Sequence, residues 1–347
     1  MRRAFSLAAP FGALLVAAMA SPFAASPVTA QAEAPATTTS VHDTLPPEVP
    51  PTQPTTVAET SVPVTTSVPT TTTTVPVSDP SDPTLAPVCG VAARGSGCRI
   101  IAYYGNPLST RMGVLGATPP QQMLPALDRR LVEWRDADPA TPTRCALELI
   151  AITAQASPGR SGLSRLRSPA EVIDRVVGWA RGAGCLVILD IQVGWSTVAQ
   201  ELHYLRPWLE QPDVHLALDP EWALPAGTKP GSKIGSLDAA DINLAITTLT
   251  EIVSTKQLSP KMLIVHRFRA FMVTNPKAIA PTPAVRLVVN MDGFGTPERK
   301  ISSYRVALQG MPTTLTGFKL FTKIEKPMMR PFDVLPLGPA PVFINYQ

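Results

Sequence analysis

The 347-residue sequence lacks the short motifs of several large enzyme classes. It contains no G-x-S-x-G nucleophile turn, no Walker phosphate-binding loop, no glycine-rich dinucleotide-binding pattern and no H-E-x-x-H zinc motif. It also has no basic run interleaved with aromatic residues, the pattern typical of nucleic-acid binding. These absences argue against serine hydrolases, nucleotide-dependent enzymes, zinc proteases and nucleic-acid-binding proteins, and we expect no cofactor.

The first 30 residues have the pattern of a signal peptide. Arg2 and Arg3 precede the apolar run AFSLAAPFGALLVAAMA, and small residues then suit cleavage near Ala30. The run is too short and too interrupted for a membrane span, so none is expected after its removal. The pattern predicts a secreted protein, extracellular or associated with the cell envelope, that leaves the cell by bacterial-type export.

Residues 31–87 contain no Lys or Arg and consist mainly of Thr, Pro, Val, Ser and Ala. Such a composition cannot bury a core, so it predicts an extended, disordered linker. Without the six acids of this linker and without Arg2 and Arg3, 28 basic and 20 acidic residues remain. A folded part with a charge of about +8 suits an anionic cell envelope or a polyanionic glycan.

Cysteine is also scarce, with four residues and no C-x-x-C spacing. Disulfides or buried thiols are therefore favoured over a zinc site, since export permits disulfides. Cys89 and Cys98 flank a glycine-rich turn and are the first choice for a local bond. Cys145 and Cys185 each open an apolar, strand-like run, so they could meet across neighbouring strands.

Residues 88–347 have the length of one (β/α)8 barrel. Short apolar, β-branched runs alternate with amphipathic stretches that carry helix signals, such as Ser168 as N-cap and Pro169 at the first helical position. Strands that alternate with helices are parallel, and eight of them favour a closed TIM-type barrel over the alternative, an open doubly wound sheet. The expected strands are 99–106, 145–153, 185–193, 214–220, 262–268, 285–292, 315–321 and 341–347. The clearest expected helices are 119–134, 168–184, 196–211, 236–254 and 296–310.

The expected strands all finish in polar or aromatic residues, and a barrel brings such ends to one rim, where barrel enzymes carry their active sites. Side-chain alternation supports this, because it places Asp219 and Glu221 on the same side of their strand. The polar or aromatic strand ends are Tyr103, Tyr104, Asn106, Thr153, Asp190, Gln192, Asp219, Glu221, His266, Arg267, Asn290, Asp292, Lys319, Asn345 and Tyr346.

Of the four histidines, only His266 lies at an expected strand end. His42 lies in the linker, His203 in a helix, and His215 toward the opposite end of the barrel, where it is expected in the core. One histidine with unspaced carboxylates is a weak metal signal, so no metal is predicted.

Carboxylates, tyrosines and a tryptophan around a barrel mouth suit carbohydrate as the partner. Glycoside cleavage needs an acid that protonates the leaving oxygen and a second group that attacks or stabilises the oxocarbenium-like carbon. The catalytic candidates are Asp190, Asp219, Glu221 and Asp292. The substrate-binding candidates are Tyr103, Tyr104, Asn106, Gln192, Trp222, His266, Arg267, Asn290, Lys319 and Tyr346.

The sequence Asp219–Pro220–Glu221 resembles the D-x-E strand ending of chitinase-like barrels that cleave N-acetylhexosamine glycans. That resemblance implies that Glu221 is the proton donor and that Asp219 holds the substrate's acetamido group, which acts as the nucleophile. We expect a raised pKa for Glu221, because Trp222 and the charge of Asp219 disfavour its ionised form. Asp219 is expected to stay ionised if rim donors such as Tyr103 or Asn290 hold it.

Three alternatives remain open at this point. Asp190 and Glu221 could form an ordinary acid–nucleophile or acid–base pair. The barrel could bind envelope glycan without catalysis, because a fold alone does not prove activity. It could also be a metal-assisted phosphodiesterase that holds phosphate with basic residues, namely Arg267, Arg269, Lys319 and Lys323.

Overall fold

The computed structural model describes residues 97–312 and 315–347. These residues belong to one compact unit, Ser78–Gln347. The expected signal peptide, the linker and Cys89 lie outside the described residues, so the predictions of export, of a disordered linker and of a Cys89–Cys98 bond stay predictions. Within the described ranges, no helix is both long and apolar enough to cross a membrane.

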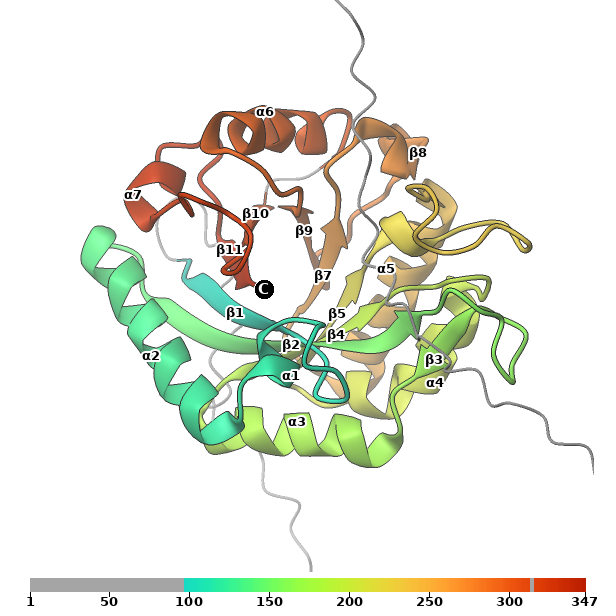
Figure 1. Ribbon diagram of the computed structural model, residues 1–347. Coiled ribbons are helices and arrows are strands. Elements are labelled where there is room, and N and C mark those ends of the chain that lie inside the picture. The colour runs from blue at the N-terminus through green and yellow to red at the C-terminus, as the bar shows by residue number, and fades with distance from the viewer. Residues whose placement is uncertain (1–96, 313–314) are drawn as a thin grey trace, which may run out of the picture. The chain divides into compact units, whose positions relative to one another are not determined.

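Eight parallel strands form a closed barrel, which Figure 1 shows enclosed by helices. The strands pair in the order β1-β11-β10-β9-β7-β5-β4-β2, and β1 also pairs with β2, which closes the sheet. The predicted (β/α)8 fold is confirmed, and each of the eight apolar runs supplies one strand. The barrel strands are β1 Arg99–Gly105, β2 Thr143–Ala154, β4 Leu186–Ile191, β5 Val214–Leu218, β7 Lys261–His266, β9 Val285–Met291, β10 Leu315–Leu320 and β11 Phe343–Tyr346.

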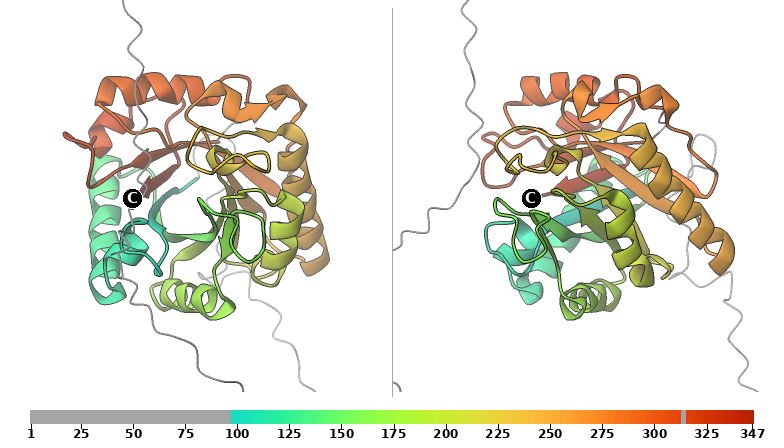
Figure 2. Two further views of the ribbon diagram at one scale, coloured as in Figure 1. Left: turned by 45° about the vertical axis from the view of Figure 1, so that its right-hand side comes forward. Right: turned by 90° about the vertical axis from the view of Figure 1, so that its right-hand side faces the viewer.

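Helices cover the outside of the barrel, as the two views of Figure 2 also show. All five predicted helices form, and the connections after β7 and β10 carry only short helical segments, as the sequence indicated. The helices are α1 Val114–Ala117, α2 Pro120–Ala137, α3 Ala170–Gly182, α4 Val198–Leu209, α5 Ala239–Lys256, α6 Pro297–Leu308 and α7 Pro331–Val334. Single 3-10 turns are η2 Pro220–Trp222, η3 Ala270–Met272 and η4 Pro276–Ala278, and the short strands outside the barrel are β3 Arg165–Arg167, β6 Leu237–Asp238 and β8 Val273–Thr274.

The strands bury side chains on both faces, because successive residues point to opposite sides of a sheet. Outward-facing residues such as Leu189 and Val265 belong to the large apolar cluster that the helices complete. Inward-facing residues such as Ile188, Ile264 and Ala217 form a smaller cluster inside the barrel. Each fully buried large apolar side chain contributes about 1.5–3 kcal/mol, so these two clusters hold the barrel together.

The start of α3 differs from its prediction. The helix begins at Ala170 with Pro169 as N-cap, and no side chain caps it, so the assignment of Ser168 as the capping residue is wrong. The Ser168 hydroxyl instead accepts from Asn106 Nδ2 at 3.1 Å and donates to the Ile150 carbonyl at 3.4 Å. Tertiary contacts between the loop after β1 and β2 therefore take the place of the local cap.

The amino ends of the strands carry a disulfide and a buried histidine. Cys145 on β2 is bonded to Cys185, directly before the neighbouring strand β4, which confirms the predicted pairing. His215 is fully buried in the core, as predicted, where its Nδ1 accepts from the Met262 N–H at 3.2 Å. Burial lowers the pKa of His215 well below its ordinary value, so its ring is neutral at neutral pH.

Candidate active site

The carboxyl ends of the strands carry a layer of polar side chains on the inner face of the barrel. Period-two alternation places these residues above the inner apolar cluster, and the strand pairing sets them side by side, as in the register of His266 with Asn290. Burial is nearly complete for most of this layer, whose members are Tyr104, Glu148, Asp190, Asp219, His266, Asn290, Asp292, Lys319 and Asn345.

Glu148 is the functional candidate that the sequence reasoning missed. It lies in the middle of β2 within a continuous apolar run, away from the strand ends on which the prediction of the site was based. It is fully buried, its Oε1 lies 3.0 Å from His266 Nε2, and its Oε2 accepts from Asn345 Nδ2 at 2.7 Å. An isolated Glu inside an apolar strand was the available signal, because a buried carboxylate needs partners.

His266 lies at the centre of this layer. Burial alone would lower its pKa, but the charges of Glu148, Asp190 and Asp292 outweigh burial and raise the pKa to about 10. The protonated ring donates from Nε2 to Glu148 and faces Asp292 Oδ2 with Nδ1 at 3.5 Å. The Asn290 amide nitrogen, 3.1 Å from Nδ1, donates to it only when the ring is neutral. When the ring loses a proton, Nδ1 can therefore change from facing Asp292 as a donor to accepting from Asn290.

Asp190 and Gln192, at the carboxyl end of β4, come together as predicted. Tyr104 donates to Asp190 Oδ2 at 3.0 Å, and Gln192 Nε2 lies 3.4 Å from the same phenol oxygen. Asp190 Oδ1 is buried and has no hydrogen-bond partner among the described residues. Burial, reinforced by Glu148 and opposed by His266 and Lys319, raises the pKa of Asp190 to about 6.

The D-P-E stretch turns directly after β5 into the 3-10 helix η2. Asp219 caps this turn, since its Oδ1 accepts from the Glu221 backbone N–H at 3.2 Å. Asp219 is 3% exposed, whereas Glu221 is only partly buried and is the more accessible of the two. The local structure thus fixes the direction in which Glu221 leaves the strand.

The pKa of Glu221 is raised to about 7, which confirms the predicted direction. Burial is the largest cause, and Asp292 rather than Asp219 supplies the main like charge. The expectation that Asp219 stays ionised is wrong, because burial and the charges of Asp292, Asp190 and Glu221 raise its pKa well above the ordinary range. Of its two expected donors, Tyr103 lies on the other face of the sheet, and the Asn290 amide nitrogen contacts His266 and Asn345 instead. Neutral carboxyl groups are therefore favoured at both ends of the D-P-E stretch in mildly acidic solution.

Four of the predicted binding residues lie away from this layer. Tyr103 and Tyr346 face outward, where their rings meet edge to face and Tyr346 accepts from Trp134 Nε1 at 2.8 Å. Asn106 holds the loop after β1, and Arg267 donates to the carbonyls of Ala307 and Gln309, both at 2.8 Å. These contacts hold the helices and loops around the barrel, so we place none of the four in the site.

Three aromatic rings lie at the outer edge of the layer. Trp222 is partly buried beside the loop that contains Gly231. Phe294, which follows β9, is 62% exposed and meets Phe321, which follows β10, edge to face with 6.1 Å between ring centroids. Neither phenylalanine was a sequence candidate, because each lies just beyond its strand.

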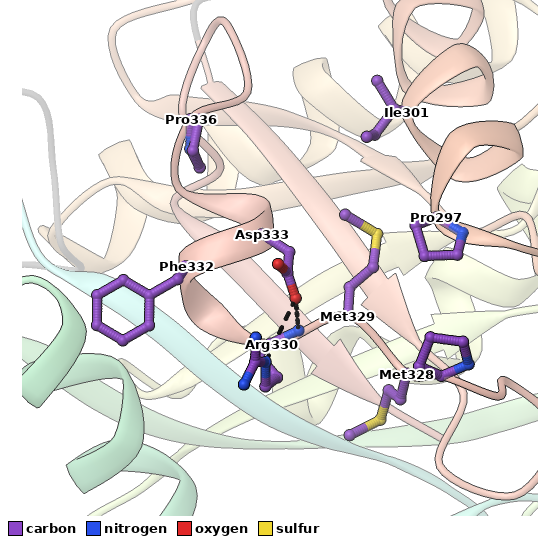
Figure 3. A pocket seen from close by; sticks show the side chains of 9 residues that line it. Pro297, Ile301, Met328, Met329, Arg330, Phe332, Asp333 and Pro336 are labelled. Carbon is purple, nitrogen blue, oxygen red and sulfur yellow. Dashed lines mark hydrogen bonds and ion pairs between the residues drawn. The ribbon is translucent and has the colours of Figure 1, made fainter.

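The polar layer is distinct from a surface hollow near α6 and α7. That hollow measures about 620 Å³, lies between α6 and the segment around α7, and contains none of the polar layer (Figure 3). Its lining residues are Pro297, Ile301, Pro327, Met328, Met329, Arg330, Phe332, Asp333 and Pro336. In the same described ranges, no group of three or more His, Cys, Asp and Glu residues is arranged to hold a metal ion.

The fold and the polar layer define a (β/α)8 barrel with a cluster of ionisable groups at the end where such barrels carry their sites. No known protein family and no curated protein matches the sequence. Among solved structures, the chain is similar to a Family 5 xyloglucanase from Paenibacillus pabuli in complex with ligand, with 12% identity and a TM-score of 0.30 over 56% of this chain and 70% of that chain. A similarity of this size carries no argument about activity, so the barrel assignment rests on the closure of the sheet.

Proposed function

We propose that the barrel is a secreted glycoside hydrolase that acts on an envelope or environmental glycan. One observation carries this proposal: Glu221, partly accessible at the mouth of the barrel, has a pKa raised to about 7 and lies in a group of carboxylates. A carboxylic acid that keeps its proton near neutral pH is what the protonation of a glycosidic oxygen requires.

In this proposal Glu221 is the general acid, and a second carboxylate attacks or stabilises the positively charged carbon. Asp292 is the first choice for the second role, because it is the strongest like charge on Glu221 and faces the His266 ring at 3.5 Å. Asp190 is the other candidate. Buried Oδ1 atoms of both aspartates have no hydrogen-bond partner in the described part of the chain and could accept from substrate hydroxyls.

Asp219 positions Glu221 through the backbone N–H that it accepts. An acetamido-binding role for Asp219 is implied only by the D-x-E resemblance, and its raised pKa suits it to donate a hydrogen bond rather than to supply negative charge. Substitution Asp219→Ala would therefore act mainly through the geometry of η2.

The test is reducing-end release from a panel of envelope and plant polysaccharides by the purified protein, with Glu221→Gln as the variant. Loss of general-acid help reduces the rate by roughly 10²–10⁴-fold. Glu171→Gln, on the exposed face of α3, is the matched control and should leave the rate unchanged. Turnover of Glu221→Gln at the wild-type rate would remove Glu221 from the mechanism. Glycan binding without turnover by either protein would support the non-catalytic alternative.

Export is a separate proposal that rests on the first 30 residues. Amino-terminal sequencing of protein recovered from the culture medium should begin close to residue 31. Full-length protein retained in the cytoplasm would contradict it.

A further inference from the structure

Lys319, on the inner face at the carboxyl end of β10, is a buried cation without an oxygen partner. It is 3% exposed, and in the described part of the chain no hydrogen-bond acceptor or carboxylate lies within bonding distance of its Nζ. Its ammonium group lies over the Tyr104 ring, 3.6 Å from the centroid, and 5.5 Å from the centroid of Phe321. Two aromatic faces hold the charge in place but leave its three N–H donors available.

The other two buried lysines show how unusual this is. Lys261 donates to the carbonyls of Gln211 and Val214, the latter at 2.8 Å. Lys300 donates to Glu325 and to the Lys319 carbonyl, the latter at 2.6 Å. Lys319 is thus the one of the three whose ammonium has no acceptor in the described part of the chain, so it can donate to an acceptor from outside.

No carboxylate of the layer forms a hydrogen bond or an ion pair with Lys319, and three of them bond to other groups. Glu148 bonds His266 and Asn345, Asp190 accepts from Tyr104, and Asp219 accepts from the Glu221 N–H. Lys319 acts on Asp190 and Glu221 only through space, where its charge opposes the rise of their pKa values. Its charge is therefore available to a ligand.

An aromatic pair lies beside Lys319 on the same side of the barrel mouth. Phe321 follows Lys319 by two residues, and its ring meets that of Phe294, which is 62% exposed. Aromatic faces of this kind pack against the apolar face of a sugar ring, while a nearby cation binds a negatively charged substituent of that sugar.

We propose that the β9–β10 side of the barrel mouth is a subsite for a sugar that carries a carboxylate, with Lys319 as the specificity-determining residue and Phe294 and Phe321 as the stacking surface. This proposal rests on the proposed function for the position of the subsite beside Glu221 and Asp292. It also agrees with the sequence, in which the folded part has about eight more basic than acidic residues. The ligand class is an acidic glycan, such as one built from uronic acids.

The test compares binding of uronic-acid oligosaccharides with binding of the same oligosaccharides after chemical reduction of their carboxyl groups. Calorimetry with the full chain carrying Glu221→Gln avoids turnover. We expect the acidic form to bind about tenfold tighter or more, as one charge-assisted hydrogen bond provides. Lys319→Gln should remove this preference, Lys319→Arg should retain part of it, and Lys323→Gln, at an exposed position nearby, should retain all of it.

Phe294→Ala should weaken binding of both forms equally, because stacking does not depend on the carboxylate. Equal binding of the acidic and reduced forms by Glu221→Gln protein, or a preference that survives Lys319→Gln, would overturn the subsite and leave the proposed hydrolase intact. Lys319-dependent binding of acidic sugars without turnover by the wild type would overturn the hydrolase and leave the subsite. Failure to bind either form would overturn the subsite proposal.

Discussion

The two ends of the barrel differ in how their buried ionisable groups are stabilised. At the amino end, Lys261 donates to two backbone carbonyls and His215 is neutral and accepts from a backbone N–H. At the carboxyl end, His266 is favoured as a cation, and burial and like charges raise the pKa of both Asp190 and Glu221. The same strands thus carry a buried lysine bonded to the backbone and a neutral histidine at one end, and a cluster of coupled ionisable side chains at the other.

The amino end of the barrel therefore serves stability, whereas the carboxyl end is the place of the proposed site. Backbone carbonyls are fixed partners, so the buried Lys261 ammonium at the amino end needs no ligand as an acceptor. At the carboxyl end, the buried Oδ1 atoms of Asp190 and Asp292 have no hydrogen-bond partner among the described residues, and the Lys319 ammonium contacts only aromatic rings there. Such costs persist in natural proteins mainly where a site uses them.

The largest expected effect comes from the ion pair at the centre of the carboxyl end. Glu148→Gln leaves the His266 cation without its charged partner, which costs roughly 3–5 kcal/mol for a buried pair. The free energy of unfolding, measured by urea denaturation at pH 7, should fall by that amount. The double variant Glu148→Gln with His266→Gln should recover much of the loss, because no uncompensated charge remains. A single variant as stable as the wild type would mean that the cluster is not electrostatically coupled.

The disulfide at the amino end should have the next largest effect. Replacing both Cys145 and Cys185 by Ala removes a cross-link between residues 40 apart, which costs roughly 2–4 kcal/mol, largely through the entropy of the unfolded chain. Urea denaturation should show the loss, while turnover per folded molecule should stay unchanged. A fall in turnover equal to that of Glu221→Gln would contradict the separation of the two ends.

Substitution of Gly317 on β10 would show how tightly the polar layer is packed. A Cβ at this position would lie 2.5 Å from Asn290 Oδ1 and 3.0 Å from Phe343 Cδ1, so Gly317→Ala must displace the Asn290 amide. We expect a loss of about 1–3 kcal/mol, as for other overpacked cores. Gly178→Ala on the exposed face of α3, where nothing lies within 4 Å of the added atom, should instead stabilise by up to about 1 kcal/mol. Equal effects of the two substitutions would contradict the close contact.

In mildly acidic solution, Asp219→Asn should change the free energy of unfolding least. The asparagine keeps an acceptor for the Glu221 N–H but cannot ionise. The folded-state pKa of Asp219 is raised, so its neutral form is favoured and the wild type loses stability as pH rises through that pKa. The variant should match the wild type near pH 4 and become progressively more stable than it at higher pH. Denaturation at pH 4, 6 and 8 measures this trend, and a stability difference independent of pH would contradict the raised pKa.

Much of the fold could be predicted, because period-two apolar runs and helix signals are local. Eight runs gave eight strands, and Cys145 with Cys185 formed the expected bond. The carboxyl-end site was predictable as a place, since parallel strands bring their ends together, and Asp190, Gln192, Asp219, Glu221, His266, Asn290, Asp292 and Lys319 do lie there.

The errors came from contacts that are distant in sequence. Tyr103 and Tyr346 looked like rim residues, yet parity and the helix α2 place them outside the barrel. Glu148 looked like an interruption of an apolar strand until His266 and Asn345 were brought beside it, 118 and 197 residues away in the chain.

The sequence by itself determined the strand and helix pattern, the barrel class and the end of the barrel that carries ionisable groups, because hydrophobic periodicity and strand-end polarity are properties of short segments. Only the tertiary structure decided which groups are charged and what each one faces. The charge of Asp292 raises the pKa of Glu221, and the Tyr104 ring holds the Lys319 ammonium. These contacts exist only after β5, β9, β10 and β1 have closed into one barrel, because the four residues lie on or just after different strands.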